Sequence, residues 1–235
     1  MVFFRWLWEM RDSSWFGLFF SLVLLLLMGG SAGVYSEVLE DQKQALKEAF
    51  LNRVPMWGNR ESKIVLVEFA DLNCSDCKTL HQTVFQKTIE YYVQSGRAVY
   101  YFVDVGMLGK DSAYGTRFSY CLQKHDPQQI QTFIDRIYAT PGQHWNASKY
   151  HSLYLSMQGQ HLPEIKRCTG SRAAQAFLEE NQRRMKKSQV QQVPALSIND
   201  RLYPYHPKAV ERGLQDLSGW LVSSLKVQPG HQAVF

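Results

Sequence analysis

Residues 67–82 of the chain read VEFADLNCSDCKTLHQ. This stretch places Cys74 and Cys77 three positions apart, directly after an apolar run. Two cysteines at this spacing can form a redox couple, supply half of a metal site, or close a small inert disulfide. The pair alone does not distinguish these roles, so the surrounding sequence has to be considered.

The segments on either side of the two cysteines predict a βαβ unit. Residues 63–69 and 97–104 are short, apolar and β-branched, which is typical of buried strands. Between them, the apolar positions of residues 74–94 recur at helical spacing, and Gly96 follows the last one. We therefore expect two parallel strands joined by a helix that begins at Cys74.

The rest of the chain predicts a block of helices followed by two more strands. The candidate helices cover residues 112–124, 127–138, 149–158, 162–168 and 171–189. Residues 194–198 and 201–205 read as strands, and Asn199-Asp200 between them is typical of a hairpin turn. Two further helices are expected at the ends of this core, at residues 37–52 and 207–225, and residues 54–59 are expected to break the pattern.

The N-terminus predicts export. Residues 15–28 read WFGLFFSLVLLLLM without a charge, and small residues follow at positions 29–33. Fourteen apolar residues fit the hydrophobic region of a signal peptide, whereas a membrane span needs about 20. Because counting on to Tyr35 gives 21 residues, an uncleaved anchor is the alternative, and residues 15–35 would then be the only membrane contact. Either interpretation places residues 36–235 outside the cytosol, where disulfides persist.

The composition is that of a globular protein with a mild basic excess. Of 235 residues 45% are hydrophobic, and the formal net charge is +5. Part of the excess lies in a cluster formed by Arg183, Arg184, Lys186 and Lys187. We interpret this cluster as a solvated helix face, because a nucleic-acid interface needs a longer basic stripe or a recognised module. No nucleic-acid partner is expected.

The position of Cys74 favours the redox role. At a helix N-terminus, unpaired backbone N–H groups and the helix dipole stabilise a thiolate, and Cys77 one turn later can resolve a mixed disulfide. A structural zinc site needs four ligands, and Cys74, Cys77 and His81 supply three. We therefore expect no metal or other cofactor, and we expect His81 to be an exposed helix residue. The inert disulfide gains little, because its loop is short.

Residues 67–78 resemble the active-site stretch of DsbA-like thiol–disulfide oxidoreductases. Val193-Pro194 looks like the cis-proline loop of that family, and a helical insert with a cysteine in each of two helices is also the family's arrangement. The resemblance covers about residues 40–226. It implies an α/β structure, namely a thioredoxin fold with a helical insert between its βαβ and ββα halves. The implied boundaries are a signal peptide or membrane anchor at 1–35, an N-terminal half at 36–111, the insert at 112–190, a C-terminal half at 191–228 and a tail at 229–235.

The resemblance also implies roles for single residues. Cys74 and Cys77 would be the catalytic pair, and Glu68 would be the acidic residue beneath them that helps proton transfer with the buried cysteine. The alternative for Glu68 is a carboxylate that faces water. Val193 and Pro194 would present backbone to a substrate peptide, with an ordinary trans-proline turn as the alternative.

The two remaining cysteines, Cys121 and Cys168, are most simply interpreted as a structural disulfide that ties the insert together. A second redox couple is the alternative. All four cysteines of the chain lie in the part that is expected to be exported, which agrees with disulfide formation.

The function implied is an exported, periplasmic thiol–disulfide oxidoreductase that acts on cysteine-containing exported proteins and works with a membrane redox partner. The strongest oxidases of the family carry Pro-His between the cysteines, whereas this chain has Ser75-Asp76. An anionic Asp76 destabilises a neighbouring thiolate, so we expect a weaker oxidant than DsbA, with a reductase or isomerase role. The alternatives are a DsbA-type dithiol oxidase and a non-catalytic thioredoxin-fold module that binds peptides.

Overall fold

The computed structural model describes residues 51–140, 142 and 144–204. Residues 54–204 belong to one compact unit that begins at Val54, and the following account concerns this part. The predicted signal peptide or anchor at 1–35, the predicted helix at 207–225 and the tail at 229–235 lie outside the described residues. The same is true of the predicted helix at 37–52, except for its last two residues.

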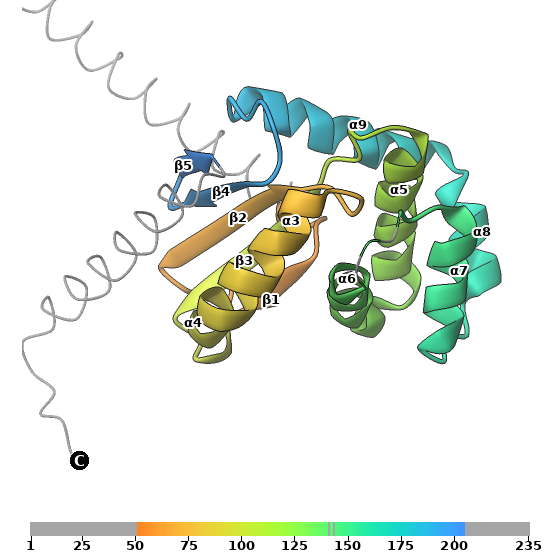
Figure 1. Cartoon of the computed structure of the whole chain (residues 1–235), viewed down its shortest axis with the longest axis horizontal. Helices are drawn as coiled ribbons and strands as arrows, with labels where there is room; N and C mark the ends of the chain where they lie inside the picture. The colour runs from red at the N-terminus through yellow and green to blue at the C-terminus, as the bar shows by residue number, and fades with distance from the viewer. Residues whose placement is uncertain (1–50, 141, 143, 205–235) are drawn as a thin grey trace, which may run out of the picture. The chain divides into compact units, whose positions relative to one another are not determined.

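A five-stranded sheet forms the centre of the described structure (Figure 1). Its strands, in chain order, are β1 (Met56–Gly58), β2 (Ile64–Ala70), β3 (Ala98–Asp104), β4 (Ala195–Ile198) and β5 (Arg201–Pro204). In space the order is β1-β3-β2-β4-β5. Strands β2 and β3 are parallel, as predicted, and the other neighbours are antiparallel.

Strand β1 was not expected, because residues 54–59 were predicted to break the pattern. Its three residues pair with the outer edge of β3, where Met56 lies opposite Tyr101. A strand this short has no periodicity of its own, so it is defined by its partner. Strand β2, by contrast, lies in the middle of the sheet and is buried almost throughout, which explains its continuous apolar run.

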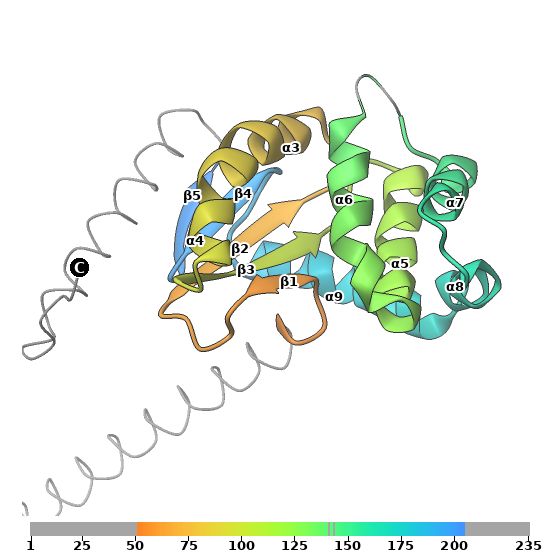
Figure 2. The same ribbon diagram turned by 90° about the horizontal axis from the view of Figure 1, so that it is seen from below.

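One long helical segment covers one face of the sheet (Figure 2). It consists of α3 (Ser75–Leu80), a π-helical stretch η2 (His81–Ile89) and α4 (Glu90–Gln94). The predicted helix at 74–94 is therefore confirmed in extent, although its nine central residues adopt the wider π-helical spacing.

Because side chains alternate along a strand, Leu66, Glu68 and Ala70 of β2 share one face of the sheet.

The chain between β3 and β4 is helical, in agreement with the prediction. It contains α5 (Lys110–His125), the 3-10 turn η3 (Pro127–Gln129), α6 (Ile130–Ala139), α7 (Ala147–Ser156), α8 (Leu162–Thr169) and α9 (Arg172–Lys187). Side-chain caps fix two helix starts: Asn146 accepts a hydrogen bond from the Lys149 N–H in α7, and Ser171 accepts one from the Ala174 N–H in α9. Helix α9 then leads the chain back to the sheet (Figure 1).

The predicted hairpin between β4 and β5 is confirmed. Asn199 and Asp200 both have positive φ, at 45° and 68°, as a two-residue turn that matches the twist of the strands requires. The Asn199 side chain also accepts a hydrogen bond of 2.8 Å from the Val65 N–H and thereby fastens the turn to the start of β2.

Among the described helices, none combines the length and the apolar character needed to cross a membrane.

Candidate active site

Cys74 lies at the N-terminal end of α3, three residues after the loop from β2 begins. It is the N-cap residue, with extended backbone angles, and its N–H donates to the carbonyl of Asp71 at 3.0 Å. The Cys77 N–H, in the first turn of the helix, donates to the Cys74 sulfur at 3.0 Å. The sulfur therefore receives a backbone amide directly, which is the interaction that stabilises a thiolate at this position.

Cys74 and Cys77 form a disulfide, with their Cα atoms 5.2 Å apart. The two residues differ in accessibility, because Cys74 is 7% exposed and Cys77 is 0% exposed. A cavity of about 290 Å³ opens beside Cys74, between the N-terminal end of α3 and a wall that includes Tyr138 and Trp145. An incoming sulfur can therefore reach Cys74 more easily than Cys77.

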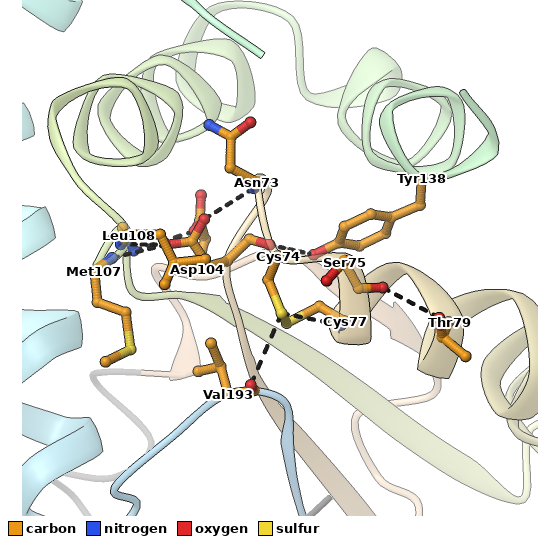
Figure 3. The surroundings of a disulfide bond; sticks show 12 residues. Asn73, Cys74, Ser75, Cys77, Thr79, Asp104, Met107, Leu108, Tyr138 and Val193 are labelled. Carbon is orange, nitrogen blue, oxygen red and sulfur yellow. Dashed lines mark hydrogen bonds between the residues drawn. A yellow bond between two sulfur atoms is a disulfide. The ribbon is translucent and has the colours of Figure 1, made fainter. Parts of the chain in front are cut away.

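The segment before β4 lies against the disulfide (Figure 3). The carbonyl oxygen of Val193 is 3.8 Å from the Cys74 sulfur. The peptide bond between Val193 and Pro194 is cis, which is the geometry that the family resemblance implies. The structure thus brings four of the predicted site residues together, namely Cys74, Cys77, Val193 and Pro194.

The two residues that hold the loop before Cys74 were missed from the sequence. Asp71 is fully buried, and its carboxylate accepts hydrogen bonds from the N–H groups of Asn73, Met107 and Leu108 at 2.8–3.1 Å. The Asn73 side chain donates to the Trp145 carbonyl at 2.9 Å and accepts from the Trp145 N–H at 2.7 Å. The sequence pattern that could have indicated them is an acidic residue, Asp71, and an amide residue, Asn73, shortly after a predicted buried strand.

A second buried carboxyl group lies beside Asp71, because β2 and β3 are parallel and both end in this region. Asp104 is the last residue of β3 and is 3% exposed. Burial, followed by repulsion from the neighbouring Asp71, raises the pKa of Asp104 well above its usual range. One of its oxygens accepts a hydrogen bond of 3.3 Å from the Gly106 N–H. Asp71 therefore accepts the N–H groups of Asn73, Met107 and Leu108 beside a second buried carboxyl group whose charged form is disfavoured.

Glu68 is buried beneath the site and does not face water. It is 1% exposed, and one carboxyl oxygen accepts a hydrogen bond from the Tyr100 hydroxyl while the other has no partner. Burial raises the pKa of Glu68 from 4.5 to about 7, although the hydrogen bond from Tyr100 and the nearby His81 oppose this change. The carboxyl group can therefore gain or lose a proton near neutral pH. The alternative interpretation of a solvent-facing carboxylate was wrong.

Replacing Glu68 with glutamine is expected to remove part of the pH dependence of stability. Between pH 4.5 and 7 the unfolded chain loses the Glu68 proton while the folded chain keeps it, so wild-type stability falls as pH rises. A shift of this size corresponds to about 3 kcal/mol. The Glu68→Gln variant should therefore gain up to about 3 kcal/mol relative to wild type between pH 4 and pH 8. Urea denaturation at both pH values measures this difference, and parallel curves for the two proteins would contradict the prediction.

His81 was expected to be exposed, and this was wrong. It is 2% exposed, its ring stacks on Phe85 with centroids 4.7 Å apart, and its Nε2 lies 2.9 Å from an Asp135 carboxylate oxygen. Helix α6 carries Asp135 and packs against η2, which begins at His81, and the local sequence pattern does not reveal this contact. Within residues 51–140, 142 and 144–204, no three side chains of the metal-binding types form a group that could hold a metal ion.

Charges next to the cysteines are arranged asymmetrically. Asp76 is exposed in the first turn of α3. The Lys78 ammonium group donates a hydrogen bond to the carbonyl of Thr140 in the helical segment. Lys78 is thus held toward Thr140 and not toward Asp76.

Cys121 and Cys168 form the second disulfide, with Cα atoms 5.8 Å apart, and join α5 to α8 away from this site.

The chain is similar to known proteins both in sequence and in structure. The family model described as "Thioredoxin" matches residues 52–216. "Probable disulfide bond formation protein D" from Bacillus cereus is 26% identical over 209 residues, which cover 85% of this chain and 95% of that protein. The structure of oxidised BdbD from Bacillus subtilis matches with a TM-score of 0.63 at 20% identity, over 71% of this chain and 93% of that one. Chlamydia trachomatis DsbA matches with a TM-score of 0.61 at 18% identity, over 73% and 93% of the two chains.

Proposed function

This chain belongs to the thioredoxin family, and we propose that it is an exported thiol–disulfide oxidoreductase that exchanges disulfides with cysteine-containing exported proteins. The observation that carries the proposal is the position of the Cys74 sulfur. Cys74 borders the cavity beside α3, and its sulfur receives the Cys77 N–H and lies beside the Val193 carbonyl at a cis-proline. The name of the Bacillus cereus relative, which refers to disulfide bond formation, supports the same activity.

The exchange proceeds through a mixed disulfide. A substrate thiolate attacks the Cys74 sulfur, a new S–S bond forms, and the Cys74–Cys77 bond breaks to release the Cys77 thiolate. A second substrate thiolate then attacks the first substrate sulfur and releases Cys74. The substrate loses two electrons and gains a disulfide, while the protein becomes a dithiol. In the opposite direction the same steps reduce a substrate disulfide, and the protein dithiol is consumed.

Glu68 and Val193 have separate roles in this scheme. The Cys77 thiolate that forms in the buried interior needs a proton, and Glu68 is a buried acid on the same side of the sheet as the overlying helix that contains Cys77. Its pKa of about 7 suits it to hold that proton near neutral pH. The backbone at Val193 and Pro194 is proposed to align the substrate peptide next to Cys74, as strand-addition sites do.

The direction of exchange is proposed to depend on Asp76. Strong oxidants of this chemistry have a stabilised dithiol form. An exposed carboxylate next to Cys74 disfavours the thiolate, and Lys78 is held toward Thr140 and offsets it little. We therefore favour a couple that is less oxidising than DsbA, with a reductase or isomerase role. The names of the relatives favour the second candidate, a dithiol oxidase that forms disulfides.

Replacing Asp76 with asparagine is expected to make the couple more oxidising. The change removes a like charge next to the Cys74 thiolate and should raise the reduction potential by roughly 10–20 mV, the size expected for an exposed charge pair. Titration against glutathione measures the potential of both proteins. A wild-type potential near −120 mV, the value of strong oxidants, would contradict the reductase or isomerase role.

The function itself is tested by reduction of insulin disulfides with the purified full chain and dithiothreitol. We expect catalysis by wild type and background rates for Cys74→Ser. An inactive wild-type chain would favour the alternative of a non-catalytic module that binds peptides, since a fold does not by itself establish catalysis.

Export and domain organisation remain proposals drawn from the sequence. The apolar segment at residues 15–28 supports a signal peptide or an anchor, and the two disulfides support an oxidising compartment such as the periplasm. The boundaries at residues 111/112 and 190/191 fall close to the start of α5 and the end of α9. Regeneration of the couple requires an external dithiol or disulfide, and we propose a membrane redox partner for this step.

A further inference from the structure

A groove of about 1010 Å³ lies next to the proposed active site. One wall is the connection between β3 and α5, including Met107 and Lys110. The other wall is the C-terminal turn of α9 with the segment that follows it, including Met185, Lys186 and Gln191. None of the proposed redox-site residues, namely Cys74, Cys77, Glu68, Val193 and Pro194, lines this groove, so the exchange chemistry does not account for it.

Both walls are connected to the disulfide through short links. The Met107 N–H donates to the Asp71 carboxylate, which also accepts the N–H of Asn73, the residue before Cys74. On the other wall, Gln191 is two positions before Val193, whose carbonyl lies against the Cys74 sulfur. In the view of Figure 3, Met107 and Val193 lie to the same side of the disulfide. Gln191, which lines the groove, is therefore only two residues from the backbone that contacts the Cys74 sulfur.

The groove has an apolar floor and a positively charged rim. Met107 is 42% exposed, and Met185 and Val190 contribute further apolar side chains. Lys110 and Lys186 are exposed at the rim, and no Asp or Glu belongs to the lining. The nearest acid in sequence, Asp111, has its carboxylate 3.1 Å from the His144 ring. Methionine side chains adapt to varied apolar partners, and the two lysines favour a negatively charged one.

We propose that this groove binds the stretch of a substrate polypeptide next to its reactive cysteine, and that it favours stretches that carry Asp or Glu. The inference rests on the proposed function and adds the class of substrate. An extended chain advances about 3.3 Å per residue. A substrate that reacts at Cys74 and follows the backbone from Val193 toward Gln191 therefore enters the groove about two residues from its own cysteine.

The test compares two dithiol peptides that reduce the oxidised full chain. The two peptides have the same cysteine pair and differ only at the positions two to four residues before and after it. One peptide carries Asp at each of these positions, and the other carries Lys. The peptide thiols become a disulfide, Cys74 and Cys77 become thiols, and alkylation followed by mass spectrometry gives the rate. We expect the acidic peptide to react about 3- to 10-fold faster with wild type. The double variant Lys110→Glu with Lys186→Glu should reverse this preference.

A matched double variant controls for net charge. Lys63→Glu with Lys124→Glu changes two exposed lysines that do not line the groove, one directly before β2 and one near the end of α5. This variant should keep the wild-type preference, and dithiothreitol should reduce all three proteins at one rate. If wild type reacted with the two peptides at equal rates, and the double variant Lys110→Glu with Lys186→Glu did the same, the inference would be overturned. The proposed function would stay intact. Failure of both peptides while dithiothreitol reacts would instead contradict the proposed function.

Discussion

Replacing Cys77 with serine is expected to trap substrates on the protein, whereas replacing Cys74 with serine should abolish exchange. The reason is the difference in accessibility, because Cys74 borders the cavity and Cys77 is fully buried. Without Cys74 no substrate can form the first S–S bond, so the exchange rate should fall at least about 1,000-fold, which corresponds to about 4 kcal/mol in the barrier. Without Cys77 the first bond still forms between Cys74 and an oxidised substrate, but nothing resolves it from within the protein.

Non-reducing gel electrophoresis distinguishes the two variants. The reduced Cys77→Ser protein, mixed with a peptide disulfide, should give a stable adduct that dithiothreitol removes, and the Cys74→Ser protein should give none. The Cys121–Cys168 disulfide is present in both variants and serves as an internal reference for correct folding. Adducts of equal yield from the two variants would show that Cys77 is as accessible to substrate as Cys74, and this would contradict the assignment of the attacking cysteine.

Replacing Cys121 and Cys168 together with alanine is expected to lower stability without stopping exchange. The disulfide closes a loop of 47 positions between α5 and α8. By the chain-entropy estimate, a loop of this length contributes about 4 kcal/mol to the free energy of unfolding. For a protein of this size the melting temperature should fall by about 8–16 °C. Circular dichroism on heating measures the change.

The insulin assay on the same double variant, at a temperature at which it is folded, tests the alternative of a second redox couple. A structural role for the disulfide requires the rate per folded molecule to stay near that of wild type. A loss of activity with an unchanged melting temperature would contradict this role and favour a second redox couple.

The sequence was sufficient for those parts of the fold that are determined by local patterns. The parallel strands β2 and β3, the helix that follows Cys74 and the β4–β5 hairpin all carry periodicity or turn residues of their own. The helical segment between β3 and β4 was predicted for the same reason, with starts that differ by two residues for α5 and α7. The pairing of Cys74 with Cys77 followed from their spacing at a helix N-terminus.

What could not be predicted depends on contacts between distant segments. The burial of His81 requires α6 to pack against η2 and to bring Asp135 to the ring. The role of Asp71 depends on the position of the N–H groups of Met107 and Leu108, which are more than 30 residues later in the chain. The groove likewise combines the start of α5 with the end of α9. No local pattern specifies such combinations.

The hydrogen bonds that hold the loop before Cys74 bear on the order of events during biosynthesis. Asp71 is bound by the backbone at residues 107 and 108, Asn73 by Trp145, and the Cys74 sulfur is contacted at Val193. A nascent chain that has emerged only as far as residue 100 already contains both cysteines but none of these contacts. The geometry at Cys74 is therefore completed only after residue 193 has been synthesised, and a shorter nascent chain carries the two thiols without the contacts that position them.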